Sequence, residues 1–408
     1  MKKMIFFKLS IAAVIVLSFA ACKKTDDTKI PPANQSATGM EEMISEKDAN
    51  PDEAAVTENT SPANVGGREG HGNHYLYTES NSAATNEILV FKIKPDGAPE
   101  SSGVIASGGA GTGKSLGSQG ALVIDQQQQW LYAVNAGANS VSSFKIEGNG
   151  NLRLAHTASV NGTTPVSVTV HDNLLYVLNR GSDNIQGFKI GGGGKLTAIE
   201  GSMQPLSSTG VDAPQISFTP DGDQVLVTEK ATNTIGTFKV ASDGSVSKGI
   251  FTASTGPTPF GFDFSRGYMI VSNAAGGAAG AGSATSYSIG NGGIPRAVNG
   301  AVASQQAAPC WVATTKYGRF AYITNTASNS ISSYYVTPWG ALYLVLGAAA
   351  KTGMNPVDIV VGTNNYDVYE LNSKSNTIGW YQRKLMGELE FKSSITNLPV
   401  SATGLATY

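Results

Sequence analysis

Charge and long apolar runs are scarce in this 408-residue chain, and each scarcity excludes a class of protein. Charged residues make up 14% of the chain and the formal net charge is -2, without the basic stripe that a nucleic-acid surface needs to neutralise phosphates. The apolar run from Leu9 to Ala21 covers 13 residues, too few to cross a bilayer as a helix. What is abundant is glycine, with 48 residues and no collagen-like period, as in a chain with many tight turns.

The N-terminus has the pattern of an export signal over residues 1–21, because lysines precede the short apolar run and small residues end it. The sequence Phe19-Ala20-Ala21-Cys22 then resembles the lipobox of bacterial lipoproteins. That resemblance implies lipid on Cys22 and an anchor to the outer membrane, on its periplasmic or outer side; the alternative is a secretory signal with an incidental cysteine. Once Cys22 carries lipid, Cys310 has no disulfide partner and stability must come from packing.

Residues 22–70 follow as a tether and residues 71–408 as the globular part. From residue 23 to residue 70 the chain has no aromatic side chain, is rich in Glu, Asp, Thr and Asn, and shows no apolar periodicity. Such a segment cannot bury enough apolar surface to fold, so we expect a disordered linker.

One pattern recurs beyond residue 71. A β-rich segment ends in Asn or Glu, a β-branched residue follows six positions later, and an aromatic residue comes three after that, as in Leu131 to Asn135 with Val141 and Phe144. Seven copies occur, two of them looser, and their aromatic residues are Phe91, Phe144, Phe188, Phe238, Tyr287, Tyr334 and Tyr381.

A turn glycine follows each aromatic residue. These glycines are Gly97, Gly150, Gly194, Gly244, Gly293, Gly340 and Gly387. They recur about every 48 residues, a period typical of propellers, and the alternation in Ser142 to Ile146 indicates strands rather than helices. The sequence predicts an all-β fold, a seven-bladed β-propeller of four-stranded antiparallel blades. We expect inner strands at segments such as 165–170 and outer strands at 196–198 and 246–247.

Ring closure is predicted from the two ends of this region. The first repeat lacks an inner strand, because the polar tether precedes Tyr75, whereas residues 402–407 form a spare strand. An open ring would leave unpaired edge groups that favour aggregation. We therefore expect the C-terminal strand to complete blade one.

Motifs for cofactors and metals are weak. Residues Gly108 to Ser115 match G-x-x-x-x-G-K-S, but a phosphate loop needs a helix after it, and a short β-type run at 121–125 follows instead. We expect a long connection between blades one and two. His156 and His171 have no second ligand at metal spacing, and His71 and His74, which flank Gly72-Asn73 at the end of the linker, have no further partner. No G-x-S-x-G elbow occurs. We expect no metal and no cofactor.

The mouth of the central channel holds the candidate site, because antiparallel order puts the ends of second strands and the starts of first strands on one face. Glu229, Lys230 and Arg180 are charged where other copies are neutral, and a carboxylate beside cations could move protons and hold an acidic substrate. The alternative is a solvated loop pair. Cys310 fits a small buried hydrophobe better than a nucleophile. The predicted ligand-binding residues at the inner-strand starts are Gln119, Gln215, Phe260, Trp311 and Asp358.

A family resemblance rests on these repeats. The YITN of 322–325, the YVLN of 176–179 and the APCWV of 308–312 resemble lactonase-type propellers related to 6-phosphogluconolactonase and carboxymuconate cyclase, over residues 73–408. The resemblance implies opening or closing of lactone rings without metal or organic cofactor, with a histidine, a glutamate and arginines around the channel. Pro214-Gln215 stands where lactonases often have Pro-His, and Gln cannot act as a general base.

Two functions remain open from the sequence. One is a lipid-anchored enzyme outside the cytoplasm, a lactonase or cycloisomerase, acting on a small non-phosphorylated lactone or sugar acid, since phosphorylated sugar lactones are cytoplasmic. The other is a non-catalytic propeller that binds a glycan or protein partner through its neutral, Ser/Asn-rich loops. We expect a monomer in either case.

Overall fold

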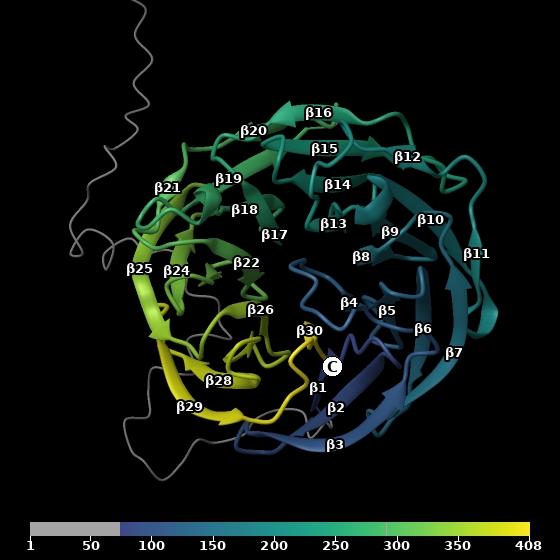
Figure 1. Ribbon diagram of the computed structural model, residues 1–408. Helices are drawn as coiled ribbons and strands as arrows, with labels where there is room; N and C mark the ends of the chain where they lie inside the picture. The colour runs from purple at the N-terminus through teal and green to yellow at the C-terminus, as the bar shows by residue number, and fades with distance from the viewer. Residues whose placement is uncertain (1–73, 291) are drawn as a thin grey trace, which may run out of the picture. The chain divides into compact units, whose positions relative to one another are not determined.

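The computed structural model describes residues 74–290 and 292–408, which form seven antiparallel sheets around a common centre (Figure 1). The predicted seven-bladed propeller is confirmed. The signal segment, Cys22, the linker and His71 lie outside the described residues. Within the described part of the chain, no helix is long and apolar enough to cross a membrane.

Each blade has four main strands, ordered from the centre outward. Blades 1 and 2 contain β30 (Thr403–Thr407), β1 (His74–Glu79), β2 (Glu87–Ile93), β3 (Pro99–Ala106), and β4 (Leu122–Ile124), β5 (Trp130–Asn135), β6 (Ser140–Ile146), β7 (Leu152–Ser159). Blades 3 and 4 contain β8 (Pro165–His171), β9 (Leu174–Asn179), β10 (Asn184–Ile190), β11 (Leu196–Ala198), and β13 (Gln215–Phe218), β14 (Gln224–Glu229), β15 (Thr234–Lys239), β16 (Ile250–Ala253).

The remaining blades repeat this order. Blade 5 contains β17 (Pro259–Ser265), β18 (Tyr268–Asn273), β19 (Ser283–Ile289) and β20 (Pro295–Ala297). Blades 6 and 7 contain β22 (Pro309–Thr314), β23 (Phe320–Asn325), β24 (Ser330–Val336), β25 (Leu342–Lys351), and β26 (Pro356–Val361), β27 (Asp367–Asn372), β28 (Thr377–Arg383), β29 (Leu389–Ile395). Two short strands add to the outer edges of blades 3 and 5, namely β12 (Gln204–Pro205) and β21 (Val302–Ala303).

The core lies between neighbouring blades. The second and third strands bury apolar side chains on both faces, and these meet the next sheet, as where Tyr176 of blade 3 packs edge-on against Phe218 of blade 4 at 5.6 Å between ring centroids. Complete burial of one such side chain contributes about 1.5 to 3 kcal/mol. Stability is therefore distributed around the ring.

The turn glycines belong to these blade interfaces. All seven have positive φ, and Gly150 shows why no side chain is tolerated. A Cβ on Gly150 would lie 2.0 Å from the ring of Tyr75 in the preceding blade, and the Tyr77 hydroxyl donates to the Gly150 carbonyl at 2.7 Å. The glycine and the aromatic strand recur together because each blade packs its turn on the previous blade.

The predicted closure is confirmed, because β30 pairs antiparallel with β1 and is the inner strand of blade 1. Tyr75 and Tyr408 exchange both backbone hydrogen bonds, at 2.8 and 3.0 Å. The two ends of the propeller thus share one sheet.

One strand differs from the prediction. The outer strand of blade 4 is β16, not the expected segment 246–247, and Val246 makes only an isolated bridge to Val240. The P-loop-like segment is a connection between β3 and β4 with no helix after it, as predicted. Figure 1 shows this connection, in blue, running inside the ring of inner strands beside β4.

Candidate functional site

The Asn that ends the second strand in five of the blades is a buried structural residue. The Asn325 amide donates to the hydroxyls of Ser330 and Ser332 on the third strand, at 3.1 and 2.8 Å, and Asn135 makes the same pair of bonds in blade 2. Both asparagines are 0% exposed. The residue therefore joins two strands of its own blade instead of opening toward the mouth.

Glu229 occupies this position in blade 4 and is also fully buried. Its carboxylate accepts hydrogen bonds from the backbone N–H and the hydroxyl of Ser207 and, at 2.7 Å, from the hydroxyl of Thr232. Ser207 lies near the start of the connection 206–214, and Thr232 lies in the turn between β14 and β15, after Lys230. Glu229 therefore holds two mouth segments together.

The two predicted cations meet at an aspartate that the sequence analysis did not select. The Lys230 ammonium lies 2.8 Å from one oxygen of Asp212, and the Arg180 guanidinium lies 3.9 Å from the other. The cationic side chains are 22% (Arg180) and 17% (Lys230) exposed, whereas Asp212 is 53% exposed and so is open to a small molecule. Burial lowers the pKa of Arg180, and the neighbouring Asp212 opposes that shift.

Two aromatic residues lie next to this cluster. The Lys230 ammonium lies 4.9 Å above the ring of Phe260, which packs against Trp311 with ring centroids 4.8 Å apart. A cation over an aromatic face is favourable by about 0.5 to 2 kcal/mol. Blades 3, 4, 5 and 6 thus each contribute one of the residues Arg180, Lys230, Phe260 and Trp311.

Residues 117–119 cross the centre of the ring. The Gln119 side chain donates to the Val312 carbonyl at 2.6 Å and accepts from the Val312 N–H at 3.0 Å. The Ser118 carbonyl accepts from the Trp311 indole at 2.8 Å, and the Gly117 carbonyl accepts from Arg180 at 3.3 Å. The segment fixes Trp311 and Arg180 in place, and Gln119, predicted to bind ligand, forms a bridge to blade 6.

Gln215 and Asp358 lie on inner strands. The side-chain amide of Gln215 is hydrogen-bonded within the protein, and the carboxyl group of Asp358 is buried. The Gln215 amide exchanges two hydrogen bonds with the backbone of Phe262, at 2.8 and 2.6 Å, and so links blades 4 and 5. Asp358 is 3% exposed on β26, accepts from the Ile359 N–H at 2.8 Å, and has its pKa raised to about 8 by burial. The polar groups of Gln215 and Asp358 thus bond to the inner strands themselves. Phe260, by contrast, lies next to Lys230 of the mouth cluster.

Nucleophilic and metal chemistry find little support at the mouth. Cys310 is buried, and burial raises the pKa of its thiol to about 12, so it is not a thiolate at neutral pH. Among the residues described, no group of three or more His, Cys, Asp or Glu side chains could hold a metal ion.

Asp212 was missed because its place in the folded ring, and not a sequence motif, marks it as a site residue. It lies in a connection between blades, has φ of +51°, and reaches Lys230 only because blades 3 and 4 are adjacent. A search for charged residues in every connection on the mouth face, and not only at strand ends, would have found it.

Comparison with known proteins agrees with this architecture. Residues 71–212 match the family model described as Lactonase, 7-bladed beta-propeller. A search of curated proteins gave no match.

Several solved structures share the fold over most of their length. A "putative 6-phosphogluconolactonase" of Bacteroides uniformis is 20% identical with a TM-score of 0.67, over 82% of this chain and 99% of that one. A protein from Lactobacillus plantarum is 18% identical with a TM-score of 0.68, over 82% and 99%. The periplasmic gluconolactonase of Pseudomonas aeruginosa is 15% identical with a TM-score of 0.65, over 82% and 98%. At these identities the likeness establishes the fold alone.

Proposed function

We propose that this lactonase-like propeller binds a small lactone or sugar acid at its mouth and opens or closes the ring without a cofactor. The observation that carries the proposal is the cluster in which two mostly buried cations, Arg180 and Lys230, share the accessible carboxylate of Asp212. The second cation is only partly neutralised, so an acidic ligand gains a charge-assisted hydrogen bond there. The match of residues 71–212 to the lactonase model supports the substrate class.

Each group has a defined task in ring opening. Arg180 and Lys230 hold the carbonyl oxygen and stabilise the negative charge that develops on it. Asp212 takes a proton from water as that water adds to the carbonyl carbon. The ring C–O bond then breaks, and the proton passes to the leaving ring oxygen, which gives the hydroxy acid. Ring closure is the reverse sequence.

Glu229 contributes by positioning in this scheme. Its hydrogen bonds to Ser207 and Thr232 fix the segments that carry Asp212 and Lys230. Proton transfer by Glu229, the role that the sequence suggested, would require these bonds to break.

Turnover of a lactone panel by Asp212→Asn tests the scheme. Asn tolerates the left-handed backbone at this position, and loss of a general base typically lowers the rate about 10² to 10⁴-fold. The matched control is Asp172→Asn, which changes an exposed aspartate with φ of +50° on the turn between β8 and β9, at the opposite end of blade 3. Equal turnover by wild type and Asp212→Asn would reject the base assignment.

A non-catalytic propeller is the second candidate. Asp212 is the accessible acid–base group of the mouth, because the Glu229 carboxylate is fully hydrogen-bonded and burial raises the pKa of the Cys310 thiol. If Asp212 transfers no proton, the mouth is a binding site without catalysis, for a glycan or a protein partner. No member of the lactone panel is then turned over above buffer, while Arg180→Ala still weakens ligand binding.

Anchoring through lipid on Cys22 would place this activity outside the cytoplasm, on the periplasmic or outer side of the outer membrane. The structural relative from Pseudomonas aeruginosa is a periplasmic protein, in line with such a location. Labelling of cells with a palmitate analogue tests it. We expect label on the wild type and none on Cys22→Ser; label that persists on the variant would refute lipidation at this residue.

A further inference from the structure

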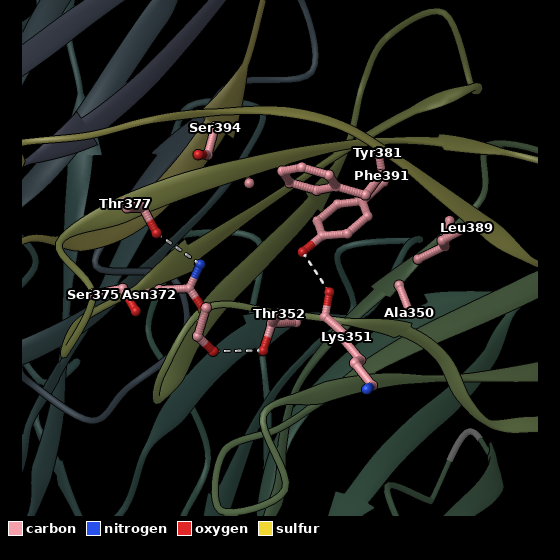
Figure 2. Close-up of a pocket in the computed structure, with 12 residues that line it drawn as sticks. Ala350, Lys351, Thr352, Asn372, Ser375, Thr377, Tyr381, Leu389, Phe391 and Ser394 are labelled. Atoms are coloured by element: carbon pink, nitrogen blue, oxygen red, sulfur yellow. Dashed lines mark hydrogen bonds between the residues drawn. The ribbon is translucent and has the colours of Figure 1, made fainter.

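A cavity lies away from the mouth cluster, in the cleft between blades 6 and 7. Its volume is about 490 Å³, large enough for a small ligand. The C-terminal end of β25 forms one side, and strands β27, β28 and β29 form the other (Figure 2). Tyr381 and Phe391 form its aromatic wall, with centroids 5.5 Å apart, and Phe391 is 56% exposed.

Comparison with blade 4 shows why blade 7 has room at this place. Both blades carry a glycine on the third strand, Gly236 and Gly379. In blade 4 the residue opposite is Phe251, whose ring covers Gly236 at 2.9 Å from the position a Cβ would take. In blade 7 the residue opposite is Ser394, which is too small to fill the place of the Phe251 ring, and Tyr381 lies over Gly379 at 2.9 Å from the position a Cβ would take.

Behind the cavity lies a buried carboxyl group, at a strand position where five other blades have an apolar residue. Five other blades have Ala133, Val177, Val227, Val271 or Ile323 two residues before the strand-end Asn or Glu, and blade 7 has Glu370. Glu370 is 0% exposed and accepts from the Asn372 amide at 2.8 Å, and its second oxygen has no hydrogen-bond partner among the described residues. A Cβ on Gly379 would lie 3.0 Å from this carboxyl.

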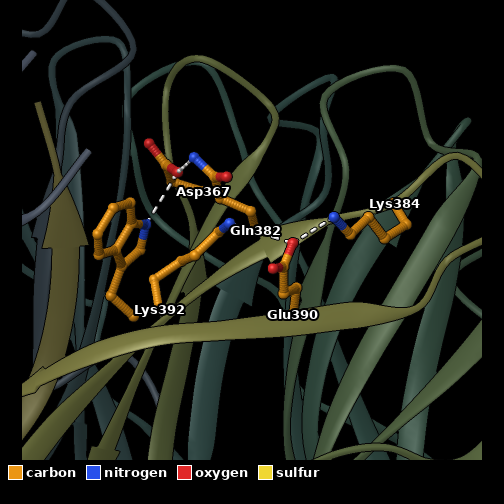
Figure 3. Close-up of polar contacts among 6 residues, drawn as sticks. Asp367, Gln382, Lys384, Glu390 and Lys392 are labelled. Atoms are coloured by element: carbon orange, nitrogen blue, oxygen red, sulfur yellow. Dashed lines mark hydrogen bonds and ion pairs between the residues drawn. The ribbon is translucent and has the colours of Figure 1, made fainter. Parts of the chain in front are cut away.

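The opposite face of blade 7 has a different character. There the Trp380 indole donates to Asp367 at 2.9 Å, and Glu390 pairs with Lys384 and Lys392, so the charges are mutually satisfied (Figure 3). Around the cavity, by contrast, the polar side chains of blade 7 are uncharged.

We propose that the cavity between blades 6 and 7 is a binding site for an uncharged sugar ring, separate from the mouth. The exposed Phe391 ring offers a face for the C–H surface of the sugar. Asn372, Ser375, Thr377 and Ser394 offer groups that donate and accept hydrogen bonds, as sugar hydroxyls require.

The charges around the cavity favour a neutral ligand over an acid or an amine. Among the lining residues Lys351 alone is charged, and its ammonium points away from the aromatic pair (Figure 2). Burial raises the pKa of Glu370 well above its usual range, which favours the uncharged form of this carboxyl. The part of the cavity beside the aromatic pair thus offers no charged lining group to a ligand.

Saturation-transfer NMR on the purified full-length protein tests this site. The probes are methyl β-glucoside, methyl β-galactoside and N-acetylglucosamine, with glucosamine and gluconate as charged counterparts. We expect transfer to the ring C–H protons of at least one neutral probe. Ser394→Phe should abolish that transfer, because the new ring takes the place that Phe251 takes in blade 4. Phe391→Ser should weaken it at least several-fold and serves if Ser394→Phe folds poorly.

Two control variants separate this site from the mouth. Glu390→Gln, on the opposite face of blade 7, and Arg180→Ala, at the mouth, should both leave the neutral signal unchanged. Binding of gluconate should respond to Arg180→Ala and not to Ser394→Phe, so failure at one site leaves the other testable. The proposal is overturned if no neutral probe binds, if the signal survives both Ser394→Phe and Phe391→Ser, or if glucosamine binds better than the neutral sugars.

Discussion

At the scale of single residues, the repeated Asn and the Glu229 that replaces it in blade 4 use the same position in opposite ways. Asn325 donates to two serine hydroxyls of its own blade, whereas Glu229 accepts from Ser207 and Thr232 and thereby fixes the loop that carries Asp212. The sequence alone predicted that this position mattered. It could not reveal the direction of the side chain, because that depends on the third strand and on the neighbouring loop.

Replacement of Glu229 by Gln tests this positioning role. In Gln the amide oxygen can still accept from the Ser207 N–H while the amide nitrogen donates to the hydroxyls of Ser207 and Thr232, so the charge-assisted hydrogen bonds of the carboxylate become neutral ones. We expect a loss of about 1 to 3 kcal/mol in the free energy of unfolding, measured by urea denaturation. A hundredfold or greater loss of turnover at unchanged stability would contradict this account and restore proton transfer to Glu229.

At the scale of strands, prediction succeeded where burial leaves a pattern and failed where it does not. The inner strand β30 was predictable because blade 1 lacked a partner for Tyr75. The outer strand β16 was misplaced by a few residues because it is largely exposed and pairs on one side only, so no apolar alternation marks it.

Deletion of residues 400–408 tests the contribution of β30. The deletion removes the ladder to β1, the hydrogen bond of Thr78 to Gly404 at 2.6 Å, and the buried side chain of Leu405. Each hydrogen bond contributes about 1 kcal/mol, and the exposed edge of β1 invites aggregation. We expect a melting temperature lower by several degrees, or aggregation, in differential scanning fluorimetry. An unchanged melting curve would show that closure does not depend on β30.

At the scale of the whole molecule, the ring brings together what the sequence separates. Arg180, Asp212, Lys230, Phe260 and Trp311 come from blades 3 to 6 or the connections between them. Residues 117–119 join blade 3, the connection that enters blade 4, and blade 6 across the centre. The sequence predicted four of these five residues, because strand ends were assigned to one face. Which of them touch depends on the order and tilt of the blades.

Buried carboxyl groups make the stability of the whole propeller depend on pH. Burial raises the pKa of Asp358 to about 8 and raises the pKa of Glu79 and Glu370 well above the usual range. The folded state therefore binds these protons more tightly than the unfolded chain does. Its advantage is complete at acidic pH and is lost as pH rises from about 4 toward 8.

We therefore expect the urea midpoint to be higher at pH 5 than at pH 8. Asp358→Asn should flatten this dependence by on the order of 1 to 3 kcal/mol, because the uncharged amide has no proton to lose. Carboxyl groups whose pKa is lowered, such as Glu390, titrate below this window and do not obscure it. A midpoint that rises between pH 5 and pH 8 would show that these buried groups do not control stability.

The central claim is that the cluster at the mouth binds an acidic ligand, and calorimetric titration with gluconate tests it most directly. The account predicts measurable binding to the wild type and a loss of about 1.5 to 3 kcal/mol in Arg180→Ala, which is roughly ten- to 150-fold in affinity. The matched control Arg153→Ala removes an exposed arginine that pairs with Glu147 on blade 2 and should bind gluconate as the wild type does. Equal affinity of Arg180→Ala and wild type, or equal weakening by both variants, would contradict the claim.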